Sequence, residues 1–461
     1  MNMEENMKKI TLGVIFLSML LASACTAIDN GNETQMPSEP TSPAETEVPE
    51  ETAAPAEGSY AKSNLERETE PQVTPENIEA LSNGNSTFAI SFYDLIRQDG
   101  ENIIFSPLSL SLALTMTMAG AESTTEQAML EALKLSLPEE EVYPAFNALM
   151  LAIEESEGQT MGMAEDSAEG NFQLNIANSI WGQSGYDFKE NYLDTLARHF
   201  GAGMYTVDYQ QDPESARNAI NDWIEQETED KIQDLIPPGA INPLTRLVLA
   251  NAIYFNGAWL YPFNETGTEE ALFTTLDGSE ITVDMMKLSG ERLSYAQGEN
   301  VQAVSLPYLS PDFAMTILVP DSGSFSSIED ALSIDSLTDL MESMRMMPVN
   351  LQMPKFDFES TVNAKDPLKS LGMAEAFDPD LADFSGITEA EKLFITDVLH
   401  KATITVDEEG TEAAAATAVI VGIESAMPDE PISLVIDRPF LFMIRHQPTG
   451  TILFMGRVTQ P

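Results

Sequence analysis

The sequence has few of the residues that metal and cofactor sites need, since it contains one cysteine and three histidines in 461 residues. Cys25 has no partner for an internal disulfide, and His199, His400 and His446 lack the close spacing of zinc or haem ligands. Gly-rich phosphate loops, Gly-x-Ser-x-Gly turns and paired-cysteine motifs are also missing. We therefore expect a protein that is not an enzyme and that holds no metal or cofactor.

Positive charge is also scarce. The chain has 22 Lys and Arg residues against 75 Asp and Glu residues, which gives a net charge of −53. Nucleic acids, anionic membranes and heparin-like polymers are bound through clusters of Lys and Arg, so the composition argues against all three as partners. Acidic runs such as 139–141 are expected on solvated faces. Hydrophobic residues make up 43% of the chain, which is enough for a full core.

The N-terminus has the pattern of an export signal. Lys8 and Lys9 precede an apolar stretch over 10–21, which is short for a membrane-spanning helix and typical of a signal peptide. Residues 22–25, Ala-Ser-Ala-Cys, fit either a bacterial lipoprotein signal or ordinary signal cleavage. We favour lipid attachment at Cys25, with a free surface thiol as the alternative. The mature protein is then extracellular or at the cell surface, tethered to the bacterial membrane if it is lipidated.

The chain after the signal divides into a linker and one domain. Residues 26–77 are rich in Glu, Pro, Thr and Ala and nearly free of large apolar side chains, so they are expected to form a disordered acidic spacer. From residue 78 to 461 the composition is that of a globular protein, without a second long linker or an internal repeat of fixed period. We expect a single domain there.

The clearest helix signal is at Ser106-Pro107, where a hydroxyl cap precedes a proline at the first helical position. Residues 108–119 are apolar on most faces as far as Gly120, so this helix is expected to be buried. A second start signal at Asp212-Pro213 predicts an amphipathic helix whose apolar spacing continues through Leu235.

Strand signals dominate the second half of the chain. Short β-rich runs occur at 314–319, 349–353, 402–406 and 452–455. Because helix signals come early and strand signals late, the fold class is expected to be α+β.

The segment 408–421, Glu-Glu-Gly-Thr-Glu followed by four alanines, has the most unusual local composition. Its alanines favour a short helix or an exposed loop. As a strand it divides by alternation into one small, uncharged face (Thr411, Ala413, Ala415, Thr417, Val419) and another (Glu412, Ala414, Ala416, Ala418, Ile420). A segment that slips between two strands over a packed core needs such a face, because a buried charge would lack a partner.

Five motifs in order resemble those of the serpin family, and the resemblance extends from about Ser86 to Pro461. The motifs are 102–109, 249–259, 408–417, 439–442 and 453–458. The resemblance implies a helix-rich half and three β-sheets, with a large central sheet that accepts one more strand.

The resemblance also implies a suicide inhibitor of serine or cysteine proteases with a reactive loop at about 408–436. Its mobile hinge would be Glu408, Glu409, Gly410, Thr411, Glu412, Ala413, Ala414, Ala415, Ala416 and Thr417. The protease cuts the exposed loop and forms an acyl-enzyme, after which the loop inserts into the central sheet and traps it. This requires a metastable native state. The alternative is a non-inhibitory serpin that acts as a binding, storage or chaperone module.

In inhibitory relatives the cut falls about fourteen residues after the hinge glycine, a length that spans the sheet at roughly 3.3 Å per residue. Counted from Gly410, this gives the bond between Glu424 and Ser425 and implies a glutamate-preferring protease. Since the loop is about four residues longer than usual, other bonds stay open. They involve Ile423, Ala426 or Met427 and would suit elastase-like or subtilisin-like proteases.

Finally, the resemblance places Trp259 at the top of the central sheet, where insertion starts. It places Ser106, Pro107, Ser109, Asn251 and His400 in a cluster under the centre of that sheet, where strands part to admit the loop. A hydrogen-bonded network there would hold the sheet shut. The alternatives are a satisfied core histidine for His400 and an ordinary core side chain for Trp259. Serine proteases are the expected partners, and we expect a monomer.

Overall fold

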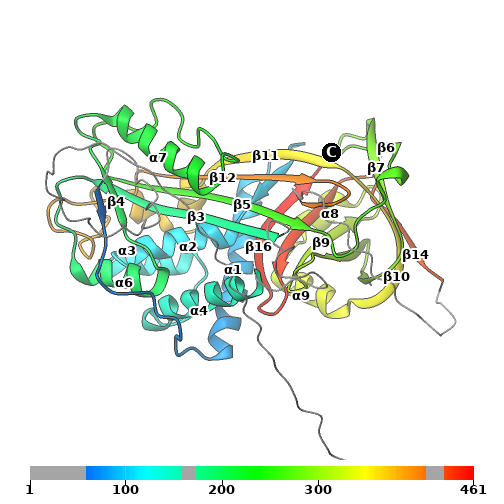
Figure 1. Ribbon diagram of the computed structural model, residues 1–461, viewed down its shortest axis with the longest axis horizontal. Helices are drawn as coiled ribbons and strands as arrows, with labels where there is room; N and C mark the ends of the chain where they lie inside the picture. Colours follow the sequence, from blue (N-terminus) through cyan, green and yellow to red (C-terminus); the bar gives the residue numbers. More distant parts are fainter. Residues whose placement is uncertain (1–58, 99, 158–171, 412–429) are drawn as a thin grey trace, which may run out of the picture. The chain divides into compact units, whose positions relative to one another are not determined.

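The computed structural model describes residues 59–98, 100–157, 172–411 and 430–461 (Figure 1). The chain divides into two units, 1–52 and 53–461, and all described residues belong to the second. Its helices are α1 (Pro75–Ile96), α2 (Pro107–Met118), α3 (Ser123–Ala132), α4 (Glu139–Glu157), α6 (Glu190–Phe200), α7 (Pro213–Glu227), α8 (Phe325–Asp330), α9 (Ile334–Ser343) and α10 (Lys365–Ser370). Within the described residues, no helix combines the length and apolar character needed to cross a membrane.

The strands of the described residues form two hydrogen-bonded sets. Sheet A has the order β1 (Ser59–Ala61), β4 (Met204–Val207), β3 (Phe172–Gln183), β5 (Leu247–Ala258), β13 (Gly410–Thr411), β12 (Asp397–Val406), β11 (Phe356–Asn363). Sheet B has the order β14 (Ile432–Val435), β10 (Arg345–Pro354), β7 (Glu280–Gln297), β8 (Val301–Pro307), β9 (Phe313–Pro320), β15 (Phe440–His446), β16 (Thr451–Val458), β2 (Ile103–Phe105), and β6 (Glu269–Thr274) pairs with β7.

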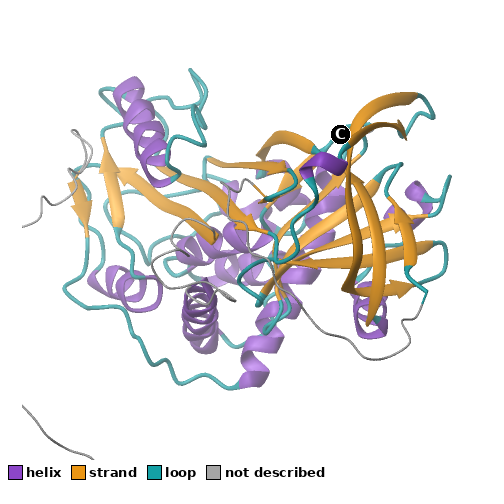
Figure 2. Cartoon of the chain, turned by 45° about the vertical axis from the view of Figure 1, so that its right-hand side comes forward, coloured by secondary structure: helices purple, strands orange, loops and turns teal. Residues whose placement is uncertain are grey.

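Sheet B contains what the family resemblance treats as two sheets. The long strand β7 pairs with β6 from Glu280 to Met285, with β10 from Met285 to Tyr295 and with β8 from Ser294 onward, so this one strand joins the two parts of sheet B. Figure 2 shows most of the helices around one half of the domain and the strands of sheet B in the other half, where α8 and α9 also lie (Figure 1). The α+β expectation is confirmed.

The buried helix predicted after Ser106 is α2. The Ser106 hydroxyl accepts a hydrogen bond from the backbone N–H of Ser109, Pro107 opens the first turn, and every residue of the helix is buried. It packs against β3 and β5 of sheet A and against β16 of sheet B. The uniform apolar composition therefore reflects a helix that lies between two sheets.

The second predicted helix is shorter than its apolar spacing suggested. It begins at Pro213 as expected but ends at Glu227. Glu229, Asp230 and Asp234 have positive φ angles, which are incompatible with continued helix. Ile232 and Leu235 are still buried, but they reach the core from a turn.

The predicted strands are all present. They lie within β9, β10, β12 and β16, each of which is longer than its sequence signal. The linker boundary at residue 77, however, is wrong for residues 59–77. β1 pairs with β4 at the edge of sheet A, and α1 begins at Pro75, capped by the Thr74 side chain. Tyr60 lies against Tyr205 with ring centroids 4.6 Å apart, so the segment is fixed by backbone pairing and by packing.

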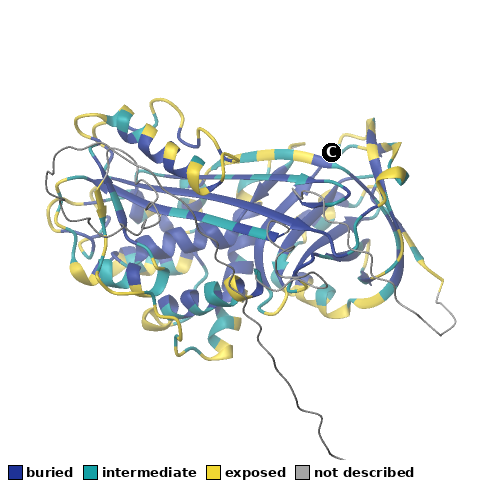
Figure 3. Cartoon of the chain, viewed as in Figure 1, coloured by how far each residue is buried: buried dark blue, intermediate teal, exposed yellow. Residues whose placement is uncertain are grey.

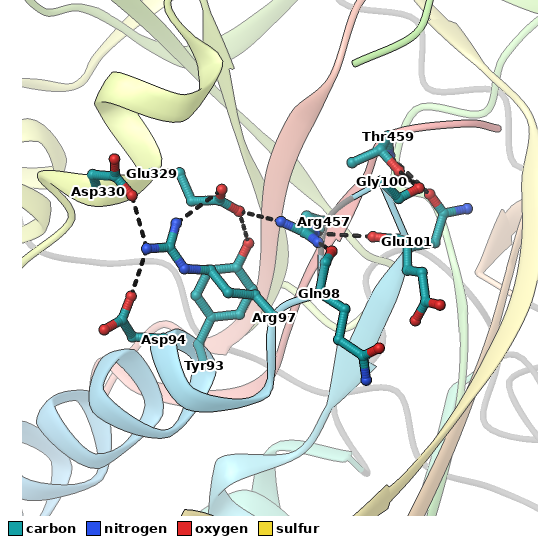
Figure 4. A network of polar contacts seen from close by, with 11 residues as sticks. Tyr93, Asp94, Arg97, Gln98, Gly100, Glu101, Glu329, Asp330, Arg457 and Thr459 are labelled. Carbon is teal, nitrogen blue, oxygen red and sulfur yellow. Dashed lines mark hydrogen bonds and ion pairs between the residues drawn. The ribbon is translucent and has the colours of Figure 1, made fainter. Parts of the chain in front are cut away.

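A buried ion cluster joins the end of α1 to α8 and β16 (Figure 4). The carboxylate of Glu329, on α8, is 2.8 Å from the Arg457 guanidinium and 3.0 Å from that of Arg97, and it accepts a hydrogen bond from the Tyr93 hydroxyl. Arg457 is 2% exposed and Glu329 8%. Arg457 also donates to the backbone carbonyl oxygens of Glu101 and Gln98, so its donors are well satisfied.

Removing the charge of Glu329 should be costly, because Arg457 would remain buried without a counter-ion. We expect Glu329→Gln to lower the free energy of unfolding by about 3 kcal/mol, measured by urea denaturation. Asp330→Asn is the matched control, since Asp330 pairs with the same Arg97 at 2.7 Å but is largely exposed and should contribute less than about 1 kcal/mol. An equal decrease in the free energy of unfolding for both variants would contradict the role of Glu329 as the buried counter-ion of Arg457.

Candidate functional site at the opening of sheet A

The central strand pair of sheet A is only partly closed. β12 pairs with β5 in parallel from Asp397 to Ala402, opposite Val248 to Ile253. Beyond Ile253 the described pairing between the two strands stops, although both strands continue to Ala258 and Val406. β5 is buried along its whole length (Figure 3). The sheet is therefore closed at one end of β5 and parted at the other.

The parted end holds the start of the predicted hinge. β13 lies between β5 and β12, with Gly410 opposite Ala258 and Thr411 opposite both Gly257 and Val406. Asp407 forms the turn that leads into β13, because its carboxylate accepts the backbone N–H groups of Glu409 and Gly410. β13 is antiparallel to both neighbours, as a strand added between two parallel strands by a tight turn must be.

Aromatic side chains hold Thr411, the second residue of β13, in place. Thr411 is 1% exposed, and its hydroxyl lies 2.9 Å from the Tyr308 hydroxyl. The Tyr308 ring stacks on Trp259 at 4.6 Å, and Trp259 donates its ring N–H to the carbonyl oxygen of Asp407 and its backbone N–H to that of Glu409. These contacts show that Thr411 faces the interior.

Glu408 forms a second anchor just before β13. Its carboxylate is 2.5 Å from the Lys355 ammonium and 2.6 Å from the Thr268 hydroxyl, and its carbonyl oxygen accepts the Phe263 N–H. Burial alone would raise the pKa of Glu408, but the hydrogen bonds from Lys355 and Thr268 outweigh it and leave that pKa below its ordinary value. The ion pair between Glu408 and Lys355 therefore holds the start of the hinge in place.

A row of polar side chains crosses the closed end of sheet A. His400 on β12 is in register with Asn251 on β5, which is in register with Asn178 on β3. The Asn251 amide donates to the Ser109 hydroxyl at 2.6 Å and to the Asn178 carbonyl oxygen, and Ser109 donates to Asn178 at 3.0 Å. We call His400, Asn251, Asn178 and Ser109 the polar row.

The protonation state of His400 follows from its contacts. Its Nε2 accepts the backbone N–H of Ser106 at 3.0 Å, so Nδ1 carries the proton and donates to the Asn251 side-chain oxygen. Complete burial lowers the pKa of His400 to about 3. The imidazole is thus neutral at physiological pH and serves as a hydrogen-bonding link between α2 and sheet A.

The structure brings Ser106, Ser109, Asn251 and His400 together, and Trp259 lies apart from them. It follows Asn251 by eight positions along β5 and the strand end, about 26 Å away at 3.3 Å per residue, and it contacts the start of the hinge. Asn178, Tyr308 and Lys355 were missed, because no local pattern marks them. Outside the described residues lie Cys25, Glu412, Ala413, Ala414, Ala415, Ala416, Thr417, Ile423, Glu424, Ser425, Ala426 and Met427.

A second histidine also meets a serine and a carboxylate, but in the wrong order for nucleophilic catalysis. Ser156 donates to Asp312 at 2.8 Å and lies 3.0 Å from His446 Nε2, whereas His446 Nδ1 meets Thr449. In a catalytic triad the carboxylate orients the histidine, and here it binds the serine. The Ser156 and His446 side chains are buried, so their contact is structural. The described residues contain no group of three or more side chains that could hold a metal ion.

The comparisons with known proteins decide the family. Residues 83–461 match the family model described as "Serpin (serine protease inhibitor)". The chain is a serpin. The family consists in general of protease inhibitors and not of catalytic enzymes.

Relatives of this serpin come from archaea and mammals. An uncharacterized serpin-like protein of Thermococcus kodakarensis is 36% identical, over 82% of this chain and 85% of the relative. The leukocyte elastase inhibitor of Sus scrofa is 34% identical, over 83% of this chain and 100% of the relative. The crystal structure of tengpin, a thermophilic serpin in the native state, superposes with a TM-score of 0.75 at 27% identity and covers 88% of this chain and 100% of tengpin.

The buried, neutral His400 should make the fold sensitive to acid. Between pH 6.5 and about 3 the unfolded chain binds a proton at His400 that the folded chain does not, so stability is present above pH 6.5 and is lost as the pH falls. His400→Gln should flatten the decline by up to about 1.4 kcal/mol per pH unit. Urea denaturation midpoints between pH 7 and 4 measure this, and parallel curves for variant and wild type would contradict it.

Proposed function

We propose that this serpin inhibits extracellular serine proteases by inserting its cleaved reactive loop into sheet A. The observation that carries the proposal is β13, because Gly410 and Thr411 of the hinge already lie as a strand between β5 and β12. The far end of the loop returns as β14, which pairs with β10 of sheet B. The loop thus connects two anchored strands, and a cut between them would free the β13 side to continue.

The register of β13 specifies where each later residue would pair. Thr411 lies opposite Gly257, and because the strands are antiparallel, each further loop residue would pair one position earlier on β5. Val421 would then lie opposite Leu247, so the loop would cover the whole of β5. Residues of the small face would point the same way as Thr411, into the interior. This supports the alternation found in the sequence.

The same register gives Thr417 a particular partner. It would lie opposite Asn251, inside the polar row, where a hydroxyl could take up hydrogen bonds released by the separation of His400 from Asn251. Insertion must break the pairing of β12 with β5 between Asp397 and Ala402. New backbone hydrogen bonds on both sides of the loop, each contributing about 1 kcal/mol, offset this loss. The polar row would therefore hold β5 and β12 together before cleavage and would separate when the loop inserts.

For the scissile bond we propose Glu424–Ser425, which implies a glutamate-preferring protease, with Ile423, Ala426 and Met427 marking the alternative bonds. We also propose that the protein is exported and attached to a lipid through Cys25, so that it acts at the surface of a bacterial cell. The signal-like segment 10–21 and the single cysteine support this location. A non-inhibitory serpin would have no need of a small, uncharged face that continues in the sequence from Thr411 through Ala413, Ala415 and Thr417.

Thr411→Arg should convert the inhibitor into a substrate, because an arginine cannot take the buried position that Thr411 already fills between β5 and β12 and would hold the start of the hinge out of the sheet. We expect wild type to form a denaturant-stable covalent complex with a susceptible serine protease, and the arginine variant to be cleaved with at least tenfold less complex. Thr411→Ser, which keeps the hydroxyl beside Tyr308, is the matched control and should trap normally. Unimpaired trapping by Thr411→Arg, or cleavage of wild type without any complex, would overturn the mechanism.

The position of the cut has its own test. If Glu424 precedes the bond, protease treatment should release a C-terminal fragment that begins at Ser425, and mass spectrometry identifies it. Glu424→Ala should weaken inhibition of a glutamate-specific protease at least tenfold while trapping by an elastase-like enzyme is retained, since the lost interaction is a charge-assisted contact in the specificity pocket. A fragment that begins elsewhere, or an unchanged preference, would place the bond at another residue.

A further inference from the structure

A pocket of about 530 Å³ lies between the β7–β8 turn and helices α8 and α9. Its apolar wall consists of Val301, Leu318, Ile328, Leu332, Leu337 and Leu340. Leu318 and Leu337 are buried, whereas Ile328, Leu332 and Leu340 are half-buried, so part of the wall stays open to solvent. The volume lies within the range of sites that hold small organic molecules, about 300–1,000 Å³.

The walls of the pocket are held in place by backbone contacts. Gly298 donates to the Val301 carbonyl oxygen at 2.8 Å, and Asp321 donates to that of Asn300 at 2.8 Å. A methyl group on Gly298 would lie 3.0 Å from the Val301 side chain and 3.3 Å from that of Leu340, so the turn packs closely on α9. The pocket is therefore preformed, and a ligand would not have to order its walls.

The acidic residues at the rim of the pocket favour a cationic ligand. Glu299 and Asp339 line the pocket and are exposed, and neither takes part in an ion pair of the described residues. No lysine or arginine is among the described residues that line it. With a net charge of −53, the whole chain also attracts cations and repels anions. An apolar wall and a free acidic rim complement a molecule that has an apolar body and a positive group.

We propose that this pocket binds a small amphiphilic cation. Its apolar body would lie on the apolar wall, and its ammonium or guanidinium group would lie between Glu299 and Asp339. The undescribed segments 26–58, 158–171 and 412–429 are poor occupants on charge grounds, since they contain no lysine or arginine and are acidic. The segment 1–25, which carries Lys8 and Lys9, is the proposed export signal and would be removed from the mature protein. Fatty acids and other anionic amphiphiles fit the wall but are repelled by the rim. The site is independent of the proposed protease trapping.

Equilibrium dialysis of the full chain against three dansyl probes tests the proposal. Dansylcadaverine is cationic, dansylamide neutral and dansylglycine anionic, while the apolar group is the same. We expect saturable binding of one equivalent, with dansylcadaverine at least fivefold tighter than dansylamide and dansylglycine weakest. Absence of saturable binding of dansylcadaverine, or equal affinity for all three probes, would overturn the proposal.

Two variants locate the binding. Ser336→Trp, on the pocket side of α9, should fill the pocket and abolish binding of every probe, whereas Thr338→Trp, on the same helix outside the pocket, should leave it unchanged. Glu299→Gln with Asp339→Asn should weaken dansylcadaverine about fivefold, to the level of dansylamide. Unchanged thermal unfolding shows that each variant folds. Binding that survives Ser336→Trp, or a cation preference that survives removal of both carboxylates, would contradict the site.

Discussion

The incomplete pairing of β5 with β12 is the constraint on which the rest of this molecule depends. Buried backbone groups need hydrogen-bond partners, and a strand that is buried along its whole length cannot leave its edge unpaired without cost. At one end β12 supplies those partners, and at the other end Gly410 and Thr411 supply them. The proposed entry of the loop between β5 and β12 follows from this arrangement, and β13 sets its direction.

The polar row and the ion cluster around Glu329 are both buried, but they differ in chemistry, and each kind of contact suits its position. The polar row crosses the strand pair that must separate, and it consists of a neutral imidazole, amides and a hydroxyl, whose individual hydrogen bonds contribute about 1 kcal/mol each. The ion cluster around Glu329 joins α1, α8 and β16, and breaking it would leave a buried charge. Neutral contacts therefore lie where the structure is proposed to move, and charged contacts lie where it stays fixed.

Charge also shapes the surface. Most Lys and Arg side chains of the described residues are committed to ion pairs with nearby acids, such as Lys355 with Glu408 in the hinge and Arg246 with Glu391. The excess of acid is left to face solvent. This favours cationic partners over polyanions, and it applies equally to a protease with a basic surface and to the pocket beside α9.

Local patterns in the sequence determined the elements whose signals are local: the capped start of α2 at Ser106, the cores of β9, β10, β12 and β16, and the small face that begins at Thr411. The motif resemblance added the family and placed His400 and Asn251 in one group. Only the tertiary structure decided the end of α7, the strand formed by residues 59–61, and the partners Asn178, Tyr308 and Lys355. The end of α7 depends on the backbone angles of Glu229, Asp230 and Asp234, which override its apolar spacing. The strand at 59–61 and the three partners depend on contacts between residues far apart in the chain, where register and packing override local preference, and such contacts leave no periodic trace in either segment alone.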